Sequence, residues 1–113
     1  MTILIADQDK GFRAFVKKLL EINGHVGIIW EACDGEEAVA LSRELQPDLV
    51  LMEIPLPRLN GLEATQRIKK TLPNIRVIIL TALAGRVHRQ AAIRSGADAV
   101  FPKSICWSPL AAQ

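Results

Sequence analysis

Short apolar runs alternate with amphipathic segments along the whole chain. The runs are rich in β-branched residues and lie at residues 3–6, 26–30, 49–52, 75–80 and 99–101. Nearly continuous apolar runs of this length are typical of strands that are buried on both faces of a sheet. In the segments between them, apolar residues recur at helical spacing, with charged residues in the remaining positions. The pattern therefore predicts strands and helices in regular alternation.

The ends of the predicted helices carry recognisable signals. Asn23-Gly24 is expected to stop the first helix, which follows the polar stretch Asp7-Gln8-Asp9. Asp34 can cap the second helix, and Pro47 ends it. The third helix is predicted to open at 61–62 and to break at 73–74, and a weaker fourth to run from about Ala84 to Ser95.

This alternation predicts the fold class. Strands joined through helices pair in parallel, the crossovers are right-handed, and the helices cover both faces of the sheet. We therefore predict an α/β fold, a three-layer sandwich around a five-stranded parallel sheet. A chain of 113 residues suits a single domain that spans residues 1–113.

Composition narrows the function classes. Half of the residues are hydrophobic and 4% are aromatic, which predicts a mostly aliphatic core. No apolar run approaches the roughly 20 residues of a membrane helix, and no secretory signal opens the chain. We therefore expect a cytoplasmic protein with no membrane partner. Cys33 and Cys106 form no close metal-ligand pair in the sequence, and buried, reduced thiols are expected.

The net charge of +2 hides an uneven distribution. Residues 1–57 hold 5 Lys/Arg against 10 Asp/Glu, whereas residues 58–94 hold 8 against 1. A partner surface explains such an asymmetry, and so does an ordinary set of solvated helix faces. Direct nucleic-acid binding is not predicted, because no recognition-helix motif or aromatic interleaving accompanies the charge. The basic residues expected to face a partner are Arg67, Lys69, Lys70, Arg86, Arg89 and Arg94.

Polar residues gather where the predicted strands end. In parallel α/β sheets the ligand site lies beyond the carboxyl ends of the strands. Acids, a hydroxyl and a lysine that converge there would form one polar site, although each alone has a simpler explanation, such as Asp9 as a helix cap. The residues at those ends are Asp7, Gln8, Asp9, Glu53, Thr81, Ala82 and Lys103.

Three stretches resemble the receiver domain of bacterial response regulators, of the kind that precedes a helix-turn-helix DNA-binding domain. They are "ILIADQD", "EACDGEEAVALSRELQPDLVLMEIPLPRLNGLEATQRIKKTLPNIRVIILTA" and "SGADAVFPKS". The resemblance covers nearly the whole chain. It implies a flavodoxin-like strand order 2-1-3-4-5, a phosphorelay role in a two-component system, and protein partners, namely a histidine kinase and an output protein or domain.

In that family an aspartate after the third strand accepts a phosphoryl group, and acids after the first strand help to hold Mg²⁺. The resemblance places the acceptor at Glu53 and the metal-site positions at Asp7, Gln8, Glu53 and Pro55. It places the phosphoryl-contact and switch positions at Thr81, Ala82, Val100 and Lys103. Four of these positions depart from the family pattern, and they are Gln8, Glu53, Pro55 and Val100.

These departures predict a pseudo-receiver. Gln8 is neutral, so two metal-site carboxylates remain of three, and Pro55 stiffens the loop that would offer a carbonyl to the metal. The extra methylene of Glu53 would move a nucleophile by about 1 Å, and misplacement of that size can cost about 10²-fold in rate. We therefore expect no phosphorylation, no catalytic residue and no cofactor beyond weak Mg²⁺ binding, and an ion pair of Glu53 with Lys103 instead.

Besides an unrelated α/β binding protein, two more specific functions stay open from the sequence. The first is a working receiver with an unusual glutamate acceptor. The second is a phosphohydrolase of the haloacid dehalogenase type, because "ADQD", a later threonine and a lysine also resemble that family, with Asp7 as nucleophile. The chain is short for that fold, and Asp98 alone does not supply its late acidic pair, so an enzyme is not predicted.

The end of the chain predicts self-association. Receivers close with a fifth helix of several turns, but only "SICWSPLAAQ" follows Lys103. Ser108 can cap a helix and Pro109 can begin it, which leaves about one turn, so the last helix is expected to be truncated or very short. An uncovered sheet face would favour a homodimer, unless the sequence is a fragment whose missing tail covers that face.

Overall fold

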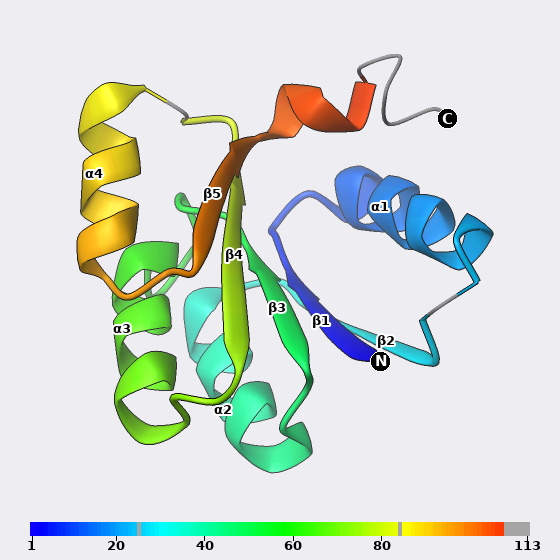
Figure 1. Ribbon diagram of the computed structural model, residues 1–113, viewed down its shortest axis with the longest axis horizontal. Helices are drawn as coiled ribbons and strands as arrows, with labels where there is room; N and C mark the ends of the chain where they lie inside the picture. Colours follow the sequence, from blue (N-terminus) through cyan, green and yellow to red (C-terminus); the bar gives the residue numbers. More distant parts are fainter. Residues whose placement is uncertain (25, 84, 108–113) are drawn as a thin grey trace.

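The computed structural model describes residues 1–24, 26–83 and 85–107 and contains five strands and four α-helices (Figure 1). The strands are β1 (Thr2–Ala6), β2 (Ile28–Ala32), β3 (Leu49–Met52), β4 (Arg76–Thr81) and β5 (Ala99–Pro102). The helices are α1 (Lys10–Ile22), α2 (Gly35–Leu45), α3 (Gly61–Thr71) and α4 (Arg86–Arg94), with a short 3₁₀ helix η1 (Lys103–Trp107).

The strands form one parallel sheet in the order β2-β1-β3-β4-β5, which confirms the predicted topology. Helix α1 lies on one side of the sheet, and α2, α3 and α4 lie on the other (Figure 1). The layers are therefore those of the predicted three-layer sandwich. All five strands run in the same direction, so their carboxyl ends meet at one edge.

Alternation along the strands divides the core into two parts. In β1, Leu4 and Ala6 belong to the cluster shared with α2, α3 and α4, whereas Ile3 and Ile5 belong to the cluster shared with α1. Successive strand side chains point to opposite faces, so each buried strand must be apolar on both. The cluster beneath α1 is the smaller one, and among the residues buried in it Phe12 and Val16 come from α1.

The helix starts follow the sequence signals closely. The side chains of Asp9, Asp34 and Asn60 each accept a hydrogen bond from a backbone N–H in the first turn of α1, α2 and α3. The predicted caps Asp9 and Asp34 are thus confirmed. The α4 helix lacks a side-chain cap of this kind, because Gly85 occupies the capping position.

Some sequence-based expectations were wrong. Strand β2 begins at Ile28 rather than Val26, since Thr2 of β1 pairs with Ile28. Cys33 is exposed and Cys106 is half-buried, so the thiols are not both buried. The predicted turn at Ser108 lies outside the described residues. None of the helices described here is both long and apolar enough to traverse a bilayer.

Candidate functional site

Three charged side chains converge at the carboxyl edge of the sheet. Asp7 follows β1, Glu53 follows β3, and Lys103 follows β5 at the start of η1. The first two are held by strand-like hydrogen bonds, because Asp7 N donates to Ala32 O at 3.0 Å and Glu53 N donates to Ala6 O at 3.0 Å. These backbone hydrogen bonds therefore fix the positions from which the two acidic side chains extend.

The Lys103 ammonium bridges the two carboxylates. Its Nζ lies 2.8 Å from Asp7 Oδ2 and 2.9 Å from Glu53 Oε2. The side chains of Asp7 and Glu53 are only 3% and 2% exposed, so both pairs lie away from bulk water. Charges buried to this degree need both a partner and hydrogen bonds. The predicted ion pair of Glu53 with Lys103 is therefore present, and Asp7 shares it.

The remaining carboxylate oxygens are also occupied. Asp7 Oδ1 accepts from Asp9 N at 2.9 Å. Glu53 Oε1 accepts from Ile54 N at 2.6 Å, and Glu53 Oε2 accepts from Ala82 N at 3.1 Å. All four oxygens of the two side chains thus have a hydrogen-bond or ion-pair partner within the protein.

The environment keeps Lys103 protonated. Burial alone would lower the pKa of its ammonium, but hydrogen bonds to Asp7 and Glu53, and the negative charge of both, outweigh that effect and raise the pKa. The Nζ atom also lies 4.2 Å from the centre of the Phe12 ring, where the π-face attracts a cation. Two carboxylates and one ammonium leave this cluster with a formal charge of −1.

Other predicted site residues lie at the same edge but take different roles. Gln8 is exposed, as is Pro55, whereas Val100 is buried in the core. Thr81 is fully buried, and its hydroxyl oxygen accepts from Leu83 N at 2.9 Å. Ala82 contributes its backbone N–H to Glu53. The structure thus brings Asp7, Glu53, Ala82 and Lys103 into contact.

Sequence reasoning missed two residues that support the site. The guanidinium of Arg13 donates to Asp7 O and pairs with Glu31 at 2.9 Å, so α1 is tied to the backbone that carries Asp7. Gly61 follows the loop of residues 53–60, and it lies so close to the start of that loop that a Cβ on Gly61 would come within 1.9 Å of Glu53 O. The Asn60-Gly61 pair after the loop was the available signal for this close approach.

Comparison with known proteins identifies the family. Residues 3–112 match the family described as "Response regulator receiver domain". The chain belongs to this family. The receiver domain is 31% identical over 109 residues to the response regulator protein VraR of Staphylococcus saprophyticus, covering 96% of this chain and 52% of that protein. It is therefore a signalling domain of the two-component type.

Two further similarities set its relation to longer proteins. The receiver domain is 36% identical over 106 residues to protein-glutamate methylesterase/protein-glutamine glutaminase 4 of Myxococcus xanthus, covering 93% of this chain and 30% of that protein. It superimposes on the crystal structure of a two-component response regulator of the LuxR family from Aurantimonas sp. SI85-9A1 with a TM-score of 0.86 and 32% identity, covering 91% of this chain and 74% of that one. The chain thus spans about half, or less, of the length of these curated relatives.

Membership of this family has consequences for the alternatives. It speaks against a haloacid dehalogenase-type phosphohydrolase, because the match covers almost all of the chain.

Proposed function

We propose that this receiver domain works as a protein-interaction module whose signalling does not depend on phosphorylation at position 53. The partners it would serve are proteins, either a kinase or an output protein or domain, and it would catalyse no reaction of its own. Because the chain spans only part of its relatives, such an output domain could belong to the same polypeptide.

One observation carries the proposal, the full engagement of the Glu53 carboxylate. One oxygen accepts from Ile54 N, and the other is shared by Lys103 Nζ and Ala82 N. A carboxylate that attacks phosphorus must present a free oxygen, and its charge must be neutralised by groups that also contact the incoming phosphoryl group. Here those groups already bind the carboxylate itself, so a phosphoryl group would have to displace them.

The donor set also fits Mg²⁺ poorly. Mg²⁺ requires oxygen ligands in near-octahedral geometry. The oxygens of Asp7 and Glu53 are occupied by Lys103 and by backbone N–H groups, and the neutral Gln8 replaces a third carboxylate. The formal charge of the cluster, −1, is therefore less negative than the −2 of a site with three carboxylates and one lysine. The residues present therefore do not fit a resident Mg²⁺ ion.

The test is phosphorylation by a small-molecule donor. We expect no gain in intact mass when the chain is incubated with acetyl phosphate and Mg²⁺, because both oxygens of the Glu53 carboxylate already have partners and the donor set fits Mg²⁺ poorly. A conventional receiver domain with an aspartate acceptor, treated in parallel, should gain one phosphoryl group. A stoichiometric gain by the native chain that disappears in Glu53→Gln would contradict the proposal and favour a working glutamate acceptor.

A further inference from the structure

The surface between α3 and α4 forms a hollow that the site at the sheet edge does not use. A cavity of about 230 Å³ is lined by Leu62, Glu63, Gln66, Ala91, Arg94 and Ser95. A second cavity of about 320 Å³ lies along α3 and is lined by Glu63, Gln66, Arg67 and Lys70. The two hollows share Glu63 and Gln66, and their combined lining is called here the α3–α4 groove.

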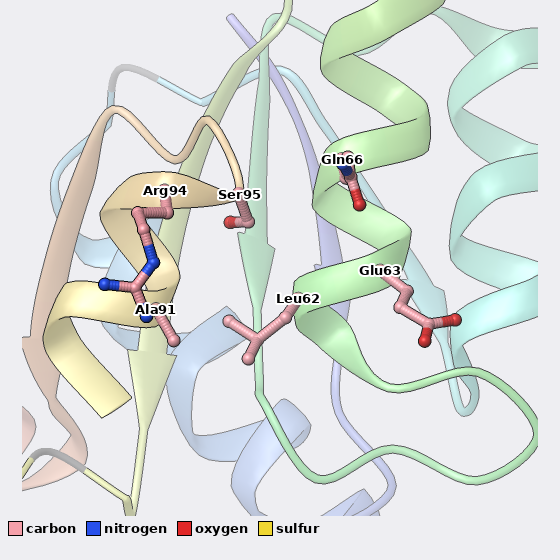
Figure 2. A pocket seen from close by; sticks show the side chains of 6 residues that line it. All are labelled: Leu62, Glu63, Gln66, Ala91, Arg94 and Ser95. Atoms are coloured by element: carbon pink, nitrogen blue, oxygen red, sulfur yellow. The ribbon is translucent and has the colours of Figure 1, made fainter. Parts of the chain in front are cut away.

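The groove has an apolar floor and a polar wall. Figure 2 shows Leu62 of α3 pointing into the space between the two helices, and Ala91 of α4 and Ser95, which directly follows that helix, also line this space. The Gln66 side chain lies one turn further along α3. The Ser95 hydroxyl already donates to Ala92 O, and its oxygen can still accept a hydrogen bond. Backbone and side chains of an extended segment could both find contacts here.

The charge of the groove is positive and unpaired. Arg67 and Lys70 on α3 and Arg94 on α4 are exposed, and none of the three forms an ion pair within the described part of the chain. Glu63 is the single acid of the lining and points away from α4 (Figure 2). Three basic and one acidic side chain leave the lining with a formal charge of +2.

The neighbouring basic residue Lys69 is paired within the fold, unlike the three basic residues that line the groove. Lys69, which was expected to face a partner, instead donates to Pro73 O, Ile75 O and Asp98 Oδ2 at 3.0–3.1 Å. Its charge is therefore neutralised inside the fold. The charges of Arg67, Lys70 and Arg94, by contrast, are left for a partner.

We propose that the α3–α4 groove binds an acidic segment of a partner protein. Aspartate and glutamate side chains would pair with the basic residues of its two walls, with bidentate geometry at the arginines, and an apolar side chain would lie over Leu62 and Ala91. A nucleic acid fits less well for two reasons. The described lining offers no aromatic ring on which a base could stack, and the Glu63 carboxylate would repel the phosphates of a bound strand. This inference does not depend on whether Glu53 accepts a phosphoryl group.

The experiment uses a defined probe, a fluorescein-labelled peptide in which pairs of Asp and Glu alternate with Leu. Its binding to the full 113-residue chain is followed by fluorescence anisotropy at about 0.1 M salt, where exposed charges more than about 10 Å apart are screened. We expect saturable binding with a dissociation constant below about 1 mM. The same peptide with Lys in place of every acid should not bind. Failure of the acidic peptide to bind would overturn the proposal.

Two matched double variants separate the groove from general charge. Arg67→Ala with Arg94→Ala removes one cation from each wall, and we expect binding to weaken by about tenfold or more. Lys18→Ala with Arg43→Ala removes the same net charge from exposed positions on α1 and α2, and we expect less than about a twofold effect. Equal losses in the two double variants would overturn the proposal, because binding would then follow the net charge alone.

A third variant tests the cavity rather than its charge. Ala91→Phe adds a ring that should fill the space beside Leu62, and we expect it to weaken peptide binding while leaving every charge in place. Full binding by this variant would contradict the groove as the site. A single-stranded oligonucleotide of equal negative charge is the last comparison. If it binds more tightly than the peptide and responds to the same variants, the surface is a nucleic-acid site and the proposal is wrong.

Discussion

At the scale of single residues, the extra methylene of Glu53 decides which groups its carboxylate contacts. Aspartate at position 53 would hold its carboxylate nearer the backbone, whereas the longer Glu53 reaches both Lys103 Nζ at 2.9 Å and Ala82 N at 3.1 Å. The lysine is already shared with Asp7. The neutral Gln8 works in the same direction, because an aspartate there would add a negative charge that attracts a metal ion.

Aspartates at both positions 8 and 53 should therefore strengthen metal binding. We expect Gln8→Asp with Glu53→Asp to bind Mg²⁺ at least about tenfold more tightly than the native chain, a gain equivalent to 1.4 kcal/mol. Isothermal titration with MgCl₂ measures this directly. Glu53→Asp alone should gain less, because one carboxylate is still missing. A double variant no better than the native chain would show that the loop carrying Pro55 is the stronger obstacle.

The sequence predicted much of this site, and the missing parts share one cause. Asp7, Glu53 and Lys103 follow apolar runs, so parallel strand order alone brings them to one edge. The length of Glu53 then predicts its pairing with Lys103. The Arg13 contact to Asp7 O depends on how α1 packs over the sheet. A long side chain on a helix surface reaches several possible partners, and its spacing in the sequence does not choose between them.

At the scale of elements, Asp98 ties three of them together. It precedes β5, accepts from Val77 N of β4 at 2.9 Å, and pairs with Lys69 of α3 at 3.0 Å. Burial alone would raise the pKa of Asp98, but the Val77 hydrogen bond and the Lys69 ammonium outweigh it, so the pKa is lowered. The charged form is therefore the one that favours the folded state.

The sign of the pH effect follows from this lowered pKa. A carboxyl whose pKa is lower in the folded state adds stability above its unfolded pKa, about 3.9, and loses it as the pH falls through the folded pKa. We expect the stability advantage of the native chain over Asp98→Asn, measured by urea unfolding, to be constant above about pH 5 and to vanish at lower pH.

A control variant isolates this effect from general acid sensitivity. Glu44→Gln removes an exposed carboxylate of α2 that forms no ion pair among the described residues. Its stability difference from the native chain should stay small at every pH, because surface charges of this kind contribute little. If Asp98→Asn shows the same flat profile as Glu44→Gln, the tie between β5, β4 and α3 does not stabilise the fold through its charge.

Element boundaries were predictable where a local signal sets them and not where pairing does. The starts of α1 and α2 follow from Asp9 and Asp34, whose side chains cap the first turn. The start of β2 follows instead from its register with β1, in which Thr2 pairs with Ile28. Val26 is as apolar as its neighbours, so hydrophobicity extended the predicted strand beyond the residues that find a partner.

At the scale of the whole molecule, the two faces of the sheet are covered unequally. Three helices lie on one side, whereas α1 and the short η1 are the described elements on the other (Figure 1). On that second side Leu49 and Leu51 of β3 are only half-buried, and Phe101 and Ile105 are 41% and 42% exposed.

We expect this 113-residue chain to self-associate through that second side, most simply around a two-fold axis, because burial of the exposed Phe101 and Ile105 against a second copy would remove apolar surface from water. Light scattering coupled to size exclusion, over about a hundredfold range of concentration, should show a mass that rises towards a dimer. Phe101→Glu should shift the chain to monomer, whereas Ile93→Glu, which places the same charge at a 58% exposed position on α4, should not. A native chain that stays monomeric throughout, or equal effects of the two variants, would mean that this face is not the interface.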